Sequence, residues 1–281
     1  MRVRRSIRLA HALMGRRRAR LLLALAISVL VTGLSMFAVL GRMQFIRQAY
    51  GWDGTASLGD AVLWLLMGHQ SSPAAGWVSV WCAVCVVALM DVRGSGEFDQ
   101  GIVATGSRCG AWAAYACAAA LLAVLTYLLM VASGLMWSAL AGFAPTLAPG
   151  SIQDISLGLV ASDCTTGDVL SYLGLGLLGA AFLGLLELAV GLWAGGAASF
   201  GLAVAVLAAS ALAPTVPLPG SFLMACRVAP LGTGLSPDGG PAFPAELGLA
   251  VLIVPSVVMA LVGALRFSRL DLGIKGKGAR R

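Results

Sequence analysis

Few residues in this sequence carry side chains that could act as acids, bases, nucleophiles or metal ligands. The two histidines, His11 and His69, stand apart, and no His-Glu-x-x-His metal motif is present. Cys82 and Cys85 have the Cys-x-x-Cys spacing of metal and redox sites, but they lie in a continuous apolar run, where cysteine is more often a small core residue. The sequence gives no nucleophile with a base and no metal site, so we expect no catalytic residues.

One ionisable residue, Glu187, lies inside a long apolar run. A carboxylate within a bilayer is costly, and such residues are usually functional or paired. Glu187 is therefore a candidate gate or substrate contact for transport. It also sits near one end of its run, so a position facing interfacial water is the alternative, and the sequence leaves both interpretations open.

The segments that hold these residues are strongly apolar. Hydrophobic types make up 59% of the 281 residues and charged types 11%, and the mean hydropathy is +0.91. Soluble domains carry roughly 25% charged residues, so this chain has too few to cover a surface that faces water. We expect it in a lipid bilayer, where helices and closed barrels satisfy the backbone, and its runs lack the alternation of barrel strands.

Six runs are long enough to cross a bilayer as helices, which takes roughly 17–25 residues. They are Leu21–Leu40, Ala74–Met90, Ala111–Ser133, Val169–Trp193, Ala197–Val216 and Leu247–Leu265. We therefore predict an all-α polytopic membrane protein with a single transmembrane domain over residues 1–281. Residues 1–20 are expected to form a basic interfacial helix, or else a disordered basic tail; residues 21–266 form the six-helix bundle and 267–281 a basic tail.

Basic residues are divided unevenly between the two sides of this bundle. Of the 19 Lys and Arg residues, all but Arg42, Arg47 and Arg227 fall at the two termini or in the connection between the second and third runs. Because Lys and Arg are enriched on the cytoplasmic side, both termini are predicted to be cytoplasmic in a cell membrane. The net charge of +7 reflects this distribution and gives little support to nucleic-acid binding.

Two cysteines, Cys164 and Cys226, are the only ones in connections predicted to lie outside the cell. An outer compartment is oxidising and can hold a disulfide. A bridge between these two residues, joining the third and fifth connections, is therefore a candidate.

Small residues and short apolar connections predict close packing. Gly176, Ala180 and Gly184 recur at a spacing of four, which lets helix backbones approach closely in lipid. The abundance of glycine, with 36 in the chain, is the alternative explanation. The outer connections SLGDAVLWLLMGH and SFLMACRVA are apolar but too short to span, so we expect the first to lie against the bundle and the second to form a re-entrant helix.

The connection between the second and third runs, DVRGSGEFDQGIVATGSRCGAW, is unusually polar. Ser95 can cap the start of a helix, and Glu97 and Asp99 suit its first turn. Gly106 can end it. The pattern predicts a short helix lying crosswise between two membrane helices on the cytoplasmic side, with a solvated loop as the alternative.

The run from GEFDQGIVATG into SRCGAW and a long apolar helix resembles the permease subunits of ABC-2 type transporters. In that family, a short coupling helix after the second span docks on a cytoplasmic ATPase, and the resemblance implies this role for residues 91–108. The basic N-terminal segment and the Pro-rich fifth connection are similar to the family's interfacial and re-entrant elements. The ATPase-coupling positions would be Glu97, Phe98, Asp99, Gly101 and Arg108.

The resemblance implies the permease subunit of an ATP-driven exporter, in which two permeases, identical or different, assemble with two ATPases. The sequence has no G-x-x-x-x-G-K-[ST] phosphate loop, so ATP and Mg²⁺ are expected on the separate ABC ATPase subunit, and this chain is expected to hold no cofactor. Sparse polar side chains in the spans favour a hydrophobic or amphipathic substrate. A secondary transporter or channel, or a membrane assembly subunit without transport, is the alternative.

Overall fold

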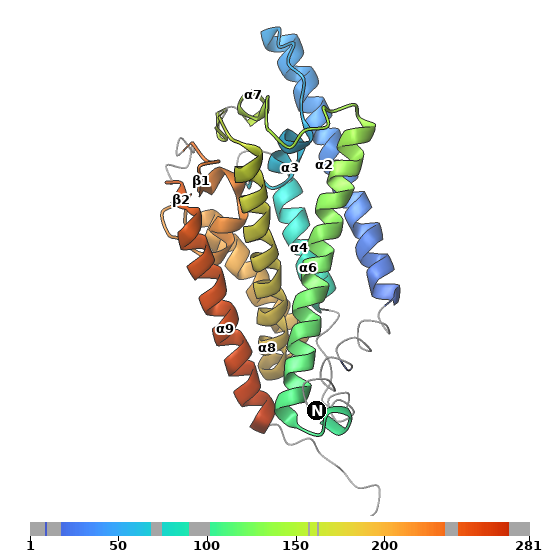
Figure 1. Ribbon diagram of the computed structural model, residues 1–281, viewed down its shortest axis with the longest axis vertical. Coiled ribbons are helices and arrows are strands. Elements are labelled where there is room, and N and C mark those ends of the chain that lie inside the picture. The colour runs from blue at the N-terminus through green and yellow to red at the C-terminus, as the bar shows by residue number, and fades with distance from the viewer. Residues whose placement is uncertain are drawn as a thin grey trace, which may run out of the picture.

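The computed structural model describes residue 9 and residues 18–68, 75–89, 102–156, 158–161, 163–233 and 241–269. This part of the chain is mostly helical, and its long helices lie along one common axis (Figure 1). The long helices are α2 (Arg18–Tyr50), α4 (Ala75–Leu89), α6 (Arg108–Leu140), α8 (Thr166–Leu212) and α9 (Ala245–Arg269).

The short elements gather at one end of the bundle, which we call the loop end (Figure 1). They are the helices α3 (Leu58–Leu65) and α7 (Ile152–Ser156), the 3-10 helices η1 (Pro219–Leu223) and η2 (Ala225–Arg227), and the parallel strands β1 (Val228–Ala229) and β2 (Phe243–Pro244). At the opposite end α6 begins at Arg108 and α9 ends at Arg269, and the Arg108 guanidinium donates to the Ser268 carbonyl at 2.6 Å. We call this the basic end.

In the part of the chain that the structure describes, four helices are long and apolar enough to cross a membrane. They cover Leu21–Tyr50, Arg108–Leu140, Thr166–Leu212 and Ala245–Arg269. Helix α4 is apolar over Trp77–Ala88 but shorter. The expected mostly helical architecture is thus found, with helices that could span a membrane. Length alone does not give the six expected spans, because the second corresponds to the shorter helix α4, and the fourth and fifth correspond to the single helix α8.

Helix α8 is interrupted at Gly195, where φ is 81° and ψ is 173°, a conformation that essentially only glycine adopts. The hydroxyl of Tyr172, near the start of α8, donates to Leu223 O at 2.6 Å, and the hydroxyl of Ser210, near its end, accepts from Gly220 N at 3.0 Å. A straight helix would place residues 172 and 210 roughly 57 Å apart. Both contact η1, so the chain reverses direction at Gly195.

Close packing of α8 against its neighbours depends on its glycines. Gly176, Ala180 and Gly184 are all buried, in agreement with the close packing expected of this face of the helix. A Cβ atom at Gly184 would lie 2.9 Å from Ala119 O of α6, and one at Gly176 would collide with the hydroxyl of Tyr127. The absent side chains therefore set the distance between α8 and α6.

The two apolar outer connections differ in how they pack. SLGDAVLWLLMGH forms α3, whose residues are nearly all buried, so the expected packing against the bundle is confirmed. SFLMACRVA is not one re-entrant helix: it forms η1, η2 and β1. The physical reason is that two N–H groups in its middle bond outside the segment: Ala225 N donates to Leu66 O at 2.9 Å and Cys226 N to Met67 O at 3.2 Å.

We expect Gly184→Leu to lower the free energy of unfolding by about 1–3 kcal/mol, because the added side chain must displace the α6 backbone. Gly174→Leu is the matched control, since the position of its Cβ has no atom within 4 Å. Thermal unfolding of the purified protein in mild detergent measures both. A melting temperature for Gly184→Leu equal to that of Gly174→Leu would contradict the packing of α8 on α6.

Candidate functional site

Glu187 lies in the interior of the bundle, on the run of α8 before the break. Its side chain has 0% of its surface exposed, and the Cys85 thiol of α4 lies beside its carboxyl group. Neither carboxyl oxygen has a hydrogen-bond partner among the residues that the structure describes. The alternative in which Glu187 faces interfacial water is therefore wrong, because the side chain is sealed from solvent in this conformation.

Two aromatic residues extend this polar region along the interior. Trp81 lies one turn before Cys85 on α4, so both point to the same side of the helix. Its ring stacks on that of Tyr127 from α6, with centroids 5.2 Å apart and an interplanar angle of 15°. Trp81 Nε1 and Tyr127 Oη are both buried and also have no partner in the described part of the chain. We call Glu187, Cys85, Trp81 and Tyr127 the buried polar cluster.

Unpaired buried polar groups are rare in native proteins, because each forfeits the hydrogen bonds it would make to water. The cluster places four such atoms, two from Glu187 and one each from Trp81 and Tyr127, among α4, α6 and α8. Side chains kept in this state are candidates for groups that acquire partners when a proton, a substrate or water enters. The cluster is thus the best-supported candidate site in the interior.

Asp60 is the other buried carboxylate that the structure describes, and its oxygens accept several hydrogen bonds. Asp60 accepts hydrogen bonds from Ser57 N at 2.7 Å, Gly150 N at 3.0 Å and Ser151 N at 3.1 Å. With Ser57 it forms a capping box at the start of α3. Asp60 is thus surrounded by backbone N–H donors, whereas the polar group described beside Glu187 is the Cys85 thiol, a weak donor whose geometry makes no hydrogen bond to either carboxyl oxygen.

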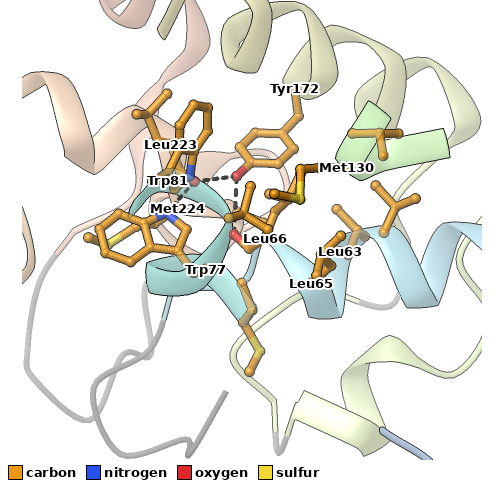
Figure 2. Packing of buried hydrophobic residues seen from close by; sticks show 14 of the residues in the cluster. Leu63, Leu65, Leu66, Trp77, Trp81, Met130, Tyr172, Leu223 and Met224 are labelled. Carbon is orange, nitrogen blue, oxygen red and sulfur yellow. Dashed lines mark hydrogen bonds between the residues drawn. The ribbon is translucent and has the colours of Figure 1, made fainter. Parts of the chain in front are cut away.

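At the loop end, the side chains of Tyr172 and Trp77 form hydrogen bonds to backbone carbonyls (Figure 2). Tyr172 Oη lies 2.6 Å from Leu223 O and 3.1 Å from Leu66 O, and Trp77 Nε1 donates to Leu223 O at 2.7 Å. These contacts tie η1 and the end of α3 to α8 and α4. Sequence reasoning did not assign Tyr172 a role, since a tyrosine in an apolar helix gives no signal of where its hydroxyl points.

A buried arginine holds the return run of α8 in place. The Arg227 side chain is 2% exposed, and it donates from one guanidinium nitrogen to Ser210 O and from another to Ala211 O. These carbonyls belong to the last turn of α8, where acceptors lack helical partners and where cations are favoured. Arg227 thus caps the end of α8, and this structural role accounts for an arginine in an outer connection.

Cys164 and Cys226 are not joined by a disulfide in the structure, so the bridge between them stays a prediction. The two connections that it would join do meet. Ala161 N donates to Leu231 O at 2.8 Å, and Val160 pairs with Gly232 in an isolated antiparallel bridge.

The chemistry of Cys164 disfavours rapid oxidation. Its thiol donates to Ala161 O at 3.2 Å. Burial raises the pKa of the Cys164 thiol to about 11, and the nearby carboxylates of Asp163 and Asp168 add to the increase. Since the thiolate is the species that attacks a disulfide, little of Cys164 is reactive near neutral pH.

The end of the expected coupling helix lies at the basic end. Residues 102–105 are helical, and Gly106, with φ of 71°, ends the segment as its N–H donates to Ile102 O at 2.7 Å. Ser107 then caps α6 by accepting from Gly110 N at 3.0 Å. The helix-ending role expected of Gly106 is confirmed. Outside the described residues lie Ser95, Glu97, Phe98, Asp99 and Gly101.

Arg108 is described, and its position suggests a different use from contact with an ATPase. It occupies the first turn of α6, and its guanidinium donates to Ser268 O at the end of α9. Nearby, Trp112 Nε1 donates to Ala260 O at 2.9 Å, and the ring of Trp112 packs against Phe267. These contacts join the beginning of α6 to the end of α9, so a displacement of one helix end would also move the other.

Comparisons of the chain with protein-family models, curated proteins and solved structures gave no match.

We expect Glu187→Gln to leave the free energy of unfolding unchanged or to raise it, because the carboxyl group has no described partner to lose and the amide carries no charge. Asp60→Asn is the control: it sets an amide N–H₂ against backbone donors and should cost about 1–3 kcal/mol. Thermal unfolding in detergent compares them. If Glu187→Gln lowered the free energy of unfolding as much as Asp60→Asn does, Glu187 would have a structural partner.

Proposed function

We propose that this chain is the membrane-spanning permease subunit of an ATP-driven exporter of the ABC-2 type, with ATP hydrolysed by a separate cytoplasmic subunit. The observation that carries the proposal is the short helix at the basic end, over residues 102–105, which Gly106 ends immediately before α6. Val103 in this helix is 83% exposed although it is apolar. An apolar side chain presented at the end of a transmembrane helix suits a docking partner.

The geometry supports a route from this helix into the bundle. Because Arg108 and Trp112 bond to the last turns of α9, a force on the short helix acts on α6 and α9 together. Helix α6 also packs at Gly184 of α8, one turn from Glu187. Closure of two ATPases beneath the basic end would thus reach the buried polar cluster through rigid helices.

The six-span topology with cytoplasmic termini belongs to this proposal. It is supported by the reversal of α8 at Gly195, which turns one long helix into two antiparallel runs, and by α4 as a shorter apolar helix. With these counted, the chain passes along the bundle axis six times. The basic end then faces the cytoplasm, in agreement with the distribution of Lys and Arg.

A hydrophobic or amphipathic substrate is supported by the surfaces that the bundle offers. A groove of about 580 Å³ opens on the side of the molecule, lined by apolar residues of α2 between Leu22 and Phe37 and by Trp137 of α6. Such a surface faces lipid in a membrane and suits a molecule that arrives from the bilayer. The buried polar cluster would then contact the polar part of the substrate.

We expect the full-length chain to co-purify with a phosphate-loop ATPase from gently solubilised membranes, and Val103→Arg to abolish this association by placing a charge on the docking surface. Gln153→Arg is the matched control, since it adds the same charge to an exposed residue of α7 at the loop end. Arg108→Glu is unsuitable as the only variant because it removes the bond to Ser268. Recovery of a stable protein without an ATPase in every mild detergent would refute the proposal.

Glu187 specifically favours a second candidate, a proton-coupled secondary transporter, because a buried carboxyl group without a partner can carry a proton. The Cys85 thiol is the titratable group beside it. In proteoliposomes this candidate predicts uptake driven by a proton gradient without ATP, and loss of that uptake in Glu187→Gln. Transport that requires the ATPase and is indifferent to the gradient would exclude it.

A further inference from the structure

A groove at the basic end, between α8 and α9, combines two arginines with an aromatic ring. It holds about 350 Å³ and is lined by Trp193, Val262, Leu265, Arg266 and Arg269. We propose that this groove binds the headgroup of an anionic phospholipid, with Arg266 and Arg269 holding its phosphate. The inference does not depend on the exporter proposal, since any protein embedded by these helices would carry the site.

Arg266 is held in place while its buried Nε donor has no partner among the described residues. Its guanidinium carbon lies 4.7 Å from the centre of the Trp193 ring, a cation–π contact. A cation–π contact does not consume the N–H donors of a guanidinium, and these donors form a fork that matches the oxygens of a phosphate. The side chain is therefore positioned for an acceptor that the described protein does not supply.

No acidic side chain in the described part of the chain neutralises this pair of arginines. Glu187 precedes Trp193 by less than two helical turns, but its oxygens have no described partner, so it does not pair with Arg266. Every other described acid lies at the loop end or at the start of α8 or α9: Asp53, Asp60, Asp154, Asp163, Asp168 and Glu246. No described acid therefore occupies the groove, which leaves its two arginines available to an anion.

The walls of the groove favour a lipid over a free phosphate ion. Val262 and Leu265 are apolar, and the exposed face of α9 continues from them toward the loop end through Leu261, Val258 and Val254. Trp193 is 61% exposed, as an aromatic ring at a membrane interface usually is. A phospholipid places its phosphate against the arginines and its acyl chains along α9, whereas a free ion gains only the first contact.

The test is native mass spectrometry of the purified full-length chain titrated with phosphatidylglycerol and, separately, phosphatidylcholine. We expect the wild-type protein to prefer phosphatidylglycerol by about 30-fold, because each basic residue near an anionic headgroup contributes about fivefold. The double variant Arg266→Gln, Arg269→Gln should lose this preference. The single variant Arg269→Gln changes an exposed residue and should lose part of the preference for phosphatidylglycerol. It keeps the test interpretable if the double variant misfolds.

The matched control is Arg42→Gln, Arg47→Gln on α2. Each of these arginines also lies 5.5 Å from an aromatic ring, but neither lines a described groove with a second arginine. The control should keep the full preference. Equal losses in the two double variants would show nonspecific attraction to charge and overturn the proposal. Displacement of the lipid by millimolar inorganic phosphate would identify a free-anion site and overturn it as well, and so would equal binding of both lipids by the wild type.

Discussion

The carbonyl of Leu223 is the acceptor on which the closed loop end depends. It lies inside an apolar chain, away from water, and accepts from Tyr172 Oη at 2.6 Å and Trp77 Nε1 at 2.7 Å. In a bilayer, a backbone group that leaves helical geometry must find its partner within the protein. The 3-10 turns of η1 and η2 are therefore possible only because α4, α8 and the end of α3 supply those partners, and the irregular connection is built from the regular helices around it.

The same constraint makes Glu187 an exception among the buried polar groups that the structure describes. Elsewhere the fold satisfies buried polar groups: the Asp60 carboxylate faces backbone donors, and Arg227 faces helix carbonyls. At Glu187 the chain bears the cost of a carboxyl group with no described partner. A residue that only filled space could be replaced by leucine at a gain in stability. This unpartnered carboxyl group is the observation behind the proposal that Glu187 accepts a proton or contacts a substrate.

Much of the architecture follows from the sequence, because apolar length and glycine spacing act locally. The helix-ending role of Gly106, the buried face of α8 and the apolar packing of α3 were predictable, since each depends on residues within one or two turns. The reversal of α8 was also expected, as the short stretch between two apolar runs. The partners of Tyr172, Arg227 and Arg266 were not, because each contact joins segments distant in the chain. The fifth connection was predicted wrongly as one helix because two of its N–H groups, at Ala225 and Cys226, bond to carbonyls of the residues that follow α3.

The segment of α8 around its break connects the two candidate sites. Glu187 lies in the interior, Trp193 forms one wall of the arginine groove, and Gly195 reverses the chain, all within about three helical turns. A rigid helix transmits a displacement along its axis, whereas a glycine break lets the run on one side tilt without the other. An anion or a partner protein that fixes the basic end would therefore set the tilt of the run that carries Glu187. Occupancy at the membrane surface and access to the buried carboxyl group would then be coupled through one helix.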